Sequence, residues 1–139
     1  MRHLSSSLID KGLDVVVHSL ADDEFPMSNL LVKTYTHDRW PINQIGRSKA
    51  MNTKLCESVS PFDIIHAHGL WMQPSLYASN TARMIGCKFC LEIHGTLSKW
   101  ALKPSNLKKL LSLYLLGQKS ILNNADLLIA TCEDEYNDI

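Results

Sequence analysis

The 139-residue sequence lacks the features that identify several common classes of protein. No apolar run approaches the length of a membrane-spanning helix, and the first residues lack the apolar core of a secretory signal, which predicts a cytoplasmic protein. Fourteen basic residues balance fourteen acidic ones, so no net charge favours nucleic acid as a partner. With 45% apolar and 20% charged residues, the chain has the composition of one globular domain, residues 1–139.

Familiar catalytic and cofactor motifs are also absent. The chain has no G-x-G-x-x-G, no Walker sequence and no serine elbow, so dinucleotide, P-loop and serine hydrolase sites lack their signatures. Cys87 and Cys90 form a C-x-x-C pair, but neither a second pair nor a spaced histidine pair accompanies it, as a structural zinc site would require. We therefore expect reduced thiols, no cofactor and no metal.

Apolar patterns predict helices that alternate with short strands. The helices are expected over residues 4–12, 48–59, 74–85 and 107–122, and the strands over 13–20, 30–35, 63–68, 88–93 and 127–130. Thr131 with Asp134 three residues later resembles a capping box that opens a last helix. This order predicts an α/β fold, a Rossmann-like parallel sheet with helices on both faces. Because a helix precedes the first strand, we expect the natural protein to start earlier.

Two of the predicted strands end in the dipeptide His-Gly. Residues 63–71 read Asp-Ile-Ile-His-Ala-His-Gly-Leu-Trp, and the strand 88–93 runs directly into His94 and a glycine. Side chains alternate along a strand, so His66 and His68 share one face. Ligands of open parallel sheets bind outside the carboxyl ends of the strands, and a glycine there lets the backbone approach a ligand closely. The sequence thus predicts a ligand site that includes His68 and His94.

The histidines permit three interpretations. A hydrogen-bonded structural role suits His66, which lies deeper in its strand, while a ligand-facing role suits His68 and His94. The H-x-H pair with His94 as a third imidazole is also a competent zinc set and resembles the opening metal motif of amidohydrolases. Such enzymes need further ligands and a buried lysine, and Lys88, the one lysine near a late strand, lies at the wrong end. A metal-dependent hydrolase is therefore kept only as an alternative.

Aromatic and basic residues follow the two His-Gly pairs. Trp71 and Trp100 each lie in a loop after a strand, where a tryptophan can stack on a sugar or anchor the loop on the core. The segment 93–125 carries five lysines, Lys103 among them, and no carboxylate. It is either the solvated face of an amphipathic helix or a surface for a phosphate-bearing acceptor or an anionic membrane.

Taken together, these motifs resemble the N-terminal half of a family 4 glycosyltransferase of the GT-B type. The resemblance covers nearly the whole chain and rests on segments 4–19, 63–74, 92–102 and 125–135. The pairing of His-Ala-His-Gly-Leu-Trp with His-Gly-Thr-Leu-Ser-Lys-Trp-Ala-Leu is its most specific part. It is closest to members that build bacterial exopolysaccharide or lipopolysaccharide.

The resemblance implies an enzyme that moves a hexose from a nucleotide diphosphate sugar to a glycan or lipid-linked acceptor, with retention. Two Rossmann-like domains would face each other, with this chain on the acceptor side and the nucleotide held by a C-terminal domain. His94 corresponds to the catalytic, sugar-facing histidine of the family. The acceptor side would be lined by His68, Gly69, Trp71, Gly95, Trp100 and Lys103.

The chain departs from the family pattern at both ends. The first strand with its Gly-Gly loop and the whole C-terminal domain are absent from the sequence. We therefore expect a fragment that is inactive by itself and belongs to a cytoplasmic enzyme, peripheral at the inner face of the membrane. Besides the hydrolase, a non-catalytic binding module that docks through the basic segment remains an alternative.

Overall fold

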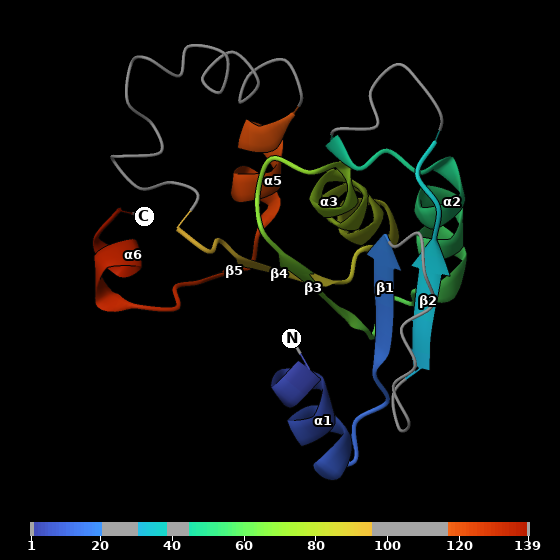
Figure 1. Ribbon diagram of the computed structural model, residues 1–139, viewed down its shortest axis with the longest axis horizontal. Helices are drawn as coiled ribbons and strands as arrows, with labels where there is room; N and C mark the ends of the chain where they lie inside the picture. Colours follow the sequence, from blue (N-terminus) through green and yellow to red (C-terminus); the bar gives the residue numbers. More distant parts are fainter. Residues whose placement is uncertain (1, 21–30, 39–44, 96–116, 139) are drawn as a thin grey trace. The chain divides into compact units, whose positions relative to one another are not determined.

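The computed structural model describes residues 2–20, 31–38, 45–95 and 117–138 (Figure 1). The helices among these residues are α1 (Arg2–Asp10), α2 (Lys49–Ser58), α3 (Gln73–Ile85), α5 (Gln118–Asn124) and α6 (Glu133–Asp138). The strands are β1 (Val16–Leu20), β2 (Leu31–Tyr35), β3 (Ile64–His68), β4 (Lys88–Glu92) and β5 (Leu127–Ile129). None of these helices is long and apolar enough to cross a membrane.

The strands form two small parallel sheets, one of β1 and β2 and one in the order β3-β4-β5. The predicted α/β class with parallel strands and flanking helices is confirmed, but the strands described do not join into one sheet. The chain divides into two compact units, Met1–Met51 and Asn52–Ile139, which are described separately below.

In the unit Met1–Met51, helix α1 ends where the sequence predicts. Gly12 adopts a left-handed conformation with φ 83°, and its N–H donates to the carbonyl of Ile9 at 2.8 Å. β1 then pairs with β2 in register from Val16 opposite Leu31 onward. At the other end of this pair the hydroxyl of Tyr35 lies 3.0 Å from Nδ1 of His18, and the two rings stack.

In the unit Asn52–Ile139, β3 and β4 alternate between an apolar and a polar face. The apolar face is buried and supplies much of the core through Ile65, Ala67, Phe89, Leu91 and Ile93. The other face carries His66 opposite Cys90 and His68 opposite Glu92 in the parallel register. Because Ile64 shares this polar face, it is 68% exposed, whereas the adjacent Ile65 is buried.

Helix α3 covers the apolar side of this sheet. It lies against β3 and β4 and packs on α5, where Asn124 Nδ2 donates to Ser79 Oγ at 3.1 Å. Pro74 occupies its first turn, where no N–H is needed, and Gly86 ends it with φ 83° and an N–H bonded to the carbonyl of Ala82. Both ends match the sequence prediction closely.

Two predicted helix starts differ from the structure. Gly117 has φ 72° and precedes α5, so a single helix running through it is wrong; most of the remaining predicted span lies outside the described residues. The capping carboxylate of α6 is that of Glu135 instead of Asp134. Thr131 donates to it from its N–H at 2.6 Å and from its hydroxyl at 2.7 Å, because α6 begins at Glu133 and puts the third helical residue within reach.

Candidate functional site

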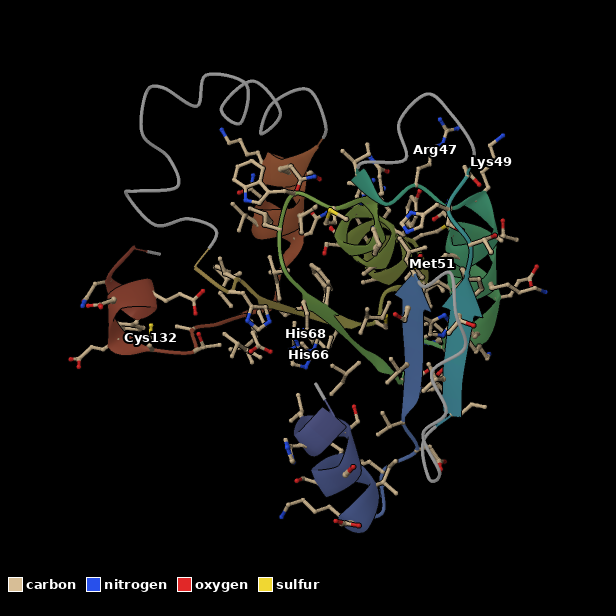
Figure 2. The ribbon with its side chains drawn as sticks, viewed as in Figure 1. Arg47, Lys49, Met51, His66, His68 and Cys132 are labelled. Atoms are coloured by element: carbon tan, nitrogen blue, oxygen red, sulfur yellow. The ribbon has the colours of Figure 1, made fainter. Side chains whose placement is uncertain are left out.

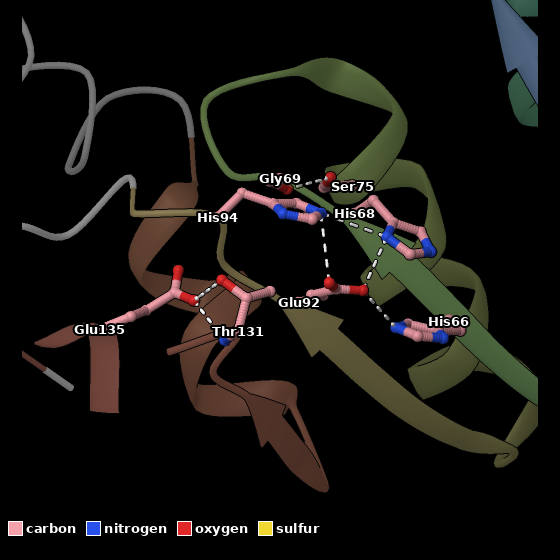
Figure 3. A network of polar contacts seen from close by, with 8 residues as sticks. All are labelled: His66, His68, Gly69, Ser75, Glu92, His94, Thr131 and Glu135. Atoms are coloured by element: carbon pink, nitrogen blue, oxygen red, sulfur yellow. Dashed lines mark hydrogen bonds and ion pairs between the residues drawn. The ribbon is translucent and has the colours of Figure 1, made fainter. Parts of the chain in front are cut away.

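The carboxyl ends of β3 and β4 bring three imidazoles together around Glu92 (Figure 3). His66 and His68 project from the same face of β3, where their rings stack with centroids 4.4 Å apart, and both are labelled on that strand in Figure 2. The His94 ring stacks on the other side of His68 with centroids 5.6 Å apart. The three imidazoles thus form one stack beside a single carboxylate.

Each imidazole of the stack lies within ion-pair distance of the Glu92 carboxylate. Oε2 is 2.9 Å from Nδ1 of His68 and 3.5 Å from Nε2 of His66. Oε1 is 3.6 Å from Nε2 of His94, and that nitrogen is also 3.3 Å from Nδ1 of His68. Glu92 is the hub of this cluster, which we call the histidine–glutamate cluster (His66, His68, Glu92 and His94).

Burial lowers the pKa of two of these imidazoles. The pKa of His66 is lowered by burial, while the Glu92 carboxylate opposes this and His94 adds to it. The pKa of His68 is lowered first by burial and then by His66, again against the effect of Glu92. The Glu92 carboxylate, 15% exposed, thus lies beside three imidazoles.

His94 occupies a strained position at the end of β4. Its backbone φ is 54°, in the left-handed region that residues other than glycine rarely adopt. Gly95 follows with φ 67°. The N–H of Gly95 donates to Oε1 of Glu135, whose other oxygen accepts from Thr131. Glu135 is only 5% exposed, so a buried carboxylate from α6 fixes the turn that presents His94.

The loop after β3 is fixed in a similar way. Gly69 has φ 80°, its N–H donates to the carbonyl of Glu92 at 2.8 Å, and its carbonyl accepts from Ser75 Oγ at 2.6 Å. Trp71, with φ 75°, donates its backbone N–H to Oε1 of the fully buried Gln118 at 2.9 Å. Two side chains from helices α3 and α5 therefore hold this loop against the carboxyl end of the sheet.

The structure brings together only some of the residues that the sequence singled out. His68 and His94 are in contact, with Gly69 and Gly95 directly after them, and Trp71 lies in the loop beyond β3. The predicted roles of these residues stay predictions, and Trp100 and Lys103 lie outside the described residues.

Sequence reasoning missed the two carboxylates. Glu92 lies two residues before His94 and opposite His68, so strand alternation and pairing of the two His-Gly ends were signals that could have found it. Glu135 gave no such signal, because only the tertiary fold brings α6 to Gly95.

Three of the clustered side chains can offer ligand atoms to one metal ion. One atom each of His66, His68 and Glu92 lies within 4.8 Å of the other two, and all three side chains are partly buried. The same groups can alternatively hydrogen-bond a polyhydroxylated ligand, since imidazoles donate and accept and a carboxylate accepts. The arrangement thus supports ligand binding at the carboxyl end of the sheet.

Comparison with known proteins gives one match. The family model described as "Glycosyl transferase 4-like domain" matches residues 1–139, the whole sequence. Neither a curated protein nor a solved structure matches the chain.

Proposed function

The chain belongs to the glycosyl transferase 4-like domain family, and from this premise we propose that it is the acceptor-side half of a retaining GT-B glycosyltransferase. The enzyme moves a hexose from a nucleotide diphosphate sugar to a hydroxyl of a glycan or lipid-linked acceptor. Its product is bacterial exopolysaccharide or lipopolysaccharide, and it acts at the inner face of the membrane. A second Rossmann-like domain supplies the nucleotide site and stabilises the leaving diphosphate.

The observation that carries this proposal is the placement of His94. Its ring lies beside His68 and Glu92 at the carboxyl ends of two adjacent parallel strands, where ligands of such sheets bind. It is the most exposed imidazole of the histidine–glutamate cluster, with 46% of its side chain accessible. In the proposed reaction His94 hydrogen-bonds a hydroxyl of the transferring sugar. This bond strengthens as positive charge develops on the sugar ring in the transition state.

The other members of the cluster act on His94 as positioning residues. Oε1 of Glu92 and Nδ1 of His68 lie at 3.6 Å and 3.3 Å from Nε2 of His94, which supports a role in orienting this ring. Gly69 and Gly95 leave room for the acceptor, since a Cβ atom at either position would meet no atom within 4 Å. Trp71 is proposed to line the same side, together with Trp100 and Lys103.

The alternative of a metal-dependent hydrolase that uses His66, His68 and His94 is not favoured, because the family match over the whole chain points to glycosyl transfer. A binding module without catalysis differs from the main proposal in one measurable respect, the turnover of a donor sugar.

The proposal is tested by expressing the complete genomic reading frame that contains this chain and supplying radiolabelled nucleotide diphosphate hexoses with membrane lipid extract. We expect transfer of label to a lipid or glycan fraction, with the anomeric configuration of the donor retained. His94→Ala should lower kcat about 100-fold or more, because an interaction with the transition state is lost, while KM for the donor changes little.

His3→Ala is the matched control, since His3 is an exposed imidazole on α1 and should leave the rate within about twofold of wild type. Absence of transfer from every donor tested would contradict the enzymatic proposal. Equal rates for wild type and His94→Ala would contradict the role of His94 while leaving the enzyme class intact.

A further inference from the structure

We infer that His66, His68 and Glu92 bind one divalent transition-metal ion of the zinc class. Two imidazole nitrogens and one carboxylate oxygen are a donor set that zinc sites with an open fourth position use. Imidazole suits zinc, copper and nickel far better than calcium or magnesium, which prefer oxygen ligands. The inference concerns ion binding alone and does not depend on the proposed sugar transfer.

The spacing of the three donor atoms fits one ion. Oε2 of Glu92 lies 2.9 Å from Nδ1 of His68 and 3.5 Å from Nε2 of His66, and all three atoms lie within 4.8 Å of one another. A tetrahedral zinc ion with bonds of about 2.1 Å holds its ligand atoms about 3.4 Å apart. Small rotations of these side chains are therefore enough to complete the site.

A second observation points to a missing partner at the same place. Nε2 of His66 is buried and has no hydrogen-bond partner among the described residues, although it faces Oε2 of Glu92. A buried polar atom without a partner destabilises the folded chain. A metal ion bound to this nitrogen and to Oε2 would remove that destabilisation, whereas the 3.5 Å contact alone does not satisfy hydrogen-bond geometry.

The three ligands lie on two adjacent strands, β3 and β4, whose backbones are paired by hydrogen bonds. His66 and His68 are two residues apart on β3, and β4 presents Glu92 directly opposite His68. The ladder is closed at this end by the bond from Gly69 N–H to the Glu92 carbonyl. Because the site needs no rearrangement of the chain, little of the binding free energy is spent on ordering it.

His94 fits the role of a supporting residue outside the ligand set. Its Nε2 lies 3.6 Å from Oε1, the oxygen of Glu92 that is not shared with His66 and His68. This ion-pair contact helps to orient the carboxylate and leaves Oε2 directed at the ion. Figure 3 shows these contacts on the two sides of the carboxylate.

Zinc binding is measured by titration calorimetry on the chelator-treated product of the complete reading frame that contains this chain, without a histidine tag and with zinc chloride as the probe. We expect one ion per chain. Glu92→Gln and His66→Ala should each weaken binding at least about tenfold, and His94→Ala by less than either. A matched control, Glu133→Gln, removes an exposed carboxylate of α6 outside the histidine–glutamate cluster and should leave the affinity unchanged.

The Cys90 thiol is the main alternative ligand for the zinc ion, since Cys90 lies opposite His66 on the same sheet face. Cobalt substitution separates the two sets: a nitrogen and oxygen site gives visible ligand-field bands without a thiolate charge-transfer band. Absence of zinc binding by folded wild-type chain would overturn the inference. So would binding that survives Glu92→Gln and is lost in Cys90→Ser. Circular dichroism spectra of each variant show that a loss of affinity does not come from unfolding.

Discussion

The two ends of the β3–β4–β5 sheet hold their carboxylates in different ways. At the amino end, Asp126 accepts from Lys88 Nζ at 2.6 Å and from the N–H of Phe89 at 2.9 Å. At the carboxyl end, Glu92 has three imidazoles as neighbours, and Glu135 is buried beneath a strained turn. A lysine pairs with the first carboxylate, whereas three imidazoles surround Glu92.

This contrast indicates which end of the sheet is available for ligands. The Asp126–Lys88 pair is exposed and self-sufficient, so it ties β4 to β5 and needs no further partner. The carboxyl end instead combines positive φ values, an unpartnered buried nitrogen and clustered ionisable groups, features that concentrate at functional sites. One end of the sheet therefore holds a self-sufficient ion pair, and the other end has features that concentrate at functional sites.

Removing the buried carboxylate at the carboxyl end should have the largest effect on stability. Glu135→Ala leaves the N–H groups of Gly95 and Thr131 and the Thr131 hydroxyl without their acceptor. We expect the free energy of unfolding to fall by about 3 kcal/mol, measured by urea denaturation. Glu133→Ala, an exposed glutamate on the same helix, should change it by less than about 0.5 kcal/mol. Equal effects of the two variants would contradict the conclusion that the buried Glu135 stabilises the carboxyl end of the sheet.

The stabilising effect of Glu135 should disappear in acid. Burial raises the pKa of this carboxyl, but hydrogen bonds from Thr131 and Gly95, together with His94, lower it further, so the pKa lies below its ordinary value of 4.5. A lowered pKa means that stability is present above pH 4.5 and is lost as the pH falls through the folded-state pKa. The difference in unfolding free energy between wild type and Glu135→Gln should therefore shrink in acid. A difference independent of pH would show that charge is not involved.

Relieving the backbone strain at His94 should raise stability, an effect that is smaller than that of Glu135→Ala and opposite in sign. His94→Gly relieves a φ of 54° and should raise the free energy of unfolding by about 0.5 kcal/mol, after the greater flexibility of glycine in the unfolded chain is subtracted. The same variant should lose sugar transfer in the complete reading frame. The matched control is Gly86→Ala, where an added Cβ meets no atom but φ is 83°, so stability should fall by about 1 kcal/mol. Destabilisation by His94→Gly would show that its contacts outweigh the strain.

Stability should depend least on the carboxylate at the amino end of the sheet, Asp126. In Asp126→Asn the amide oxygen still accepts from Phe89, and only the exposed pairing with Lys88 is lost. Since exposed ion pairs contribute little, we expect a decrease in stability smaller than any effect above, and one that vanishes at high salt. Thermal unfolding at two salt concentrations measures this. A salt-independent loss as large as that of Glu135→Ala would remove the distinction between the two ends.

Short sequence patterns predicted much of this fold, because helix ends and strand faces depend on interactions between residues close in the sequence. The bounds of α3 follow from a first-turn proline and a terminal glycine, and the shared face of His66 and His68 follows from strand alternation. Ile64 shows the limit of such reasoning. The sequence shows it as half of an apolar pair, but the side of the sheet on which α3 packs determines which isoleucine is buried.

The sequence by itself determined the element order, the parallel α/β class, the two His-Gly strand ends and the resemblance to family 4 glycosyltransferases. Tertiary structure alone decided that Glu92 became the hub of the imidazoles and that Glu135 came to hold Gly95. The physical reason is range. Capping, alternation and turn chemistry act over a few residues, whereas Gly95 and Glu135 are 40 positions apart and meet only when strands and helices pack.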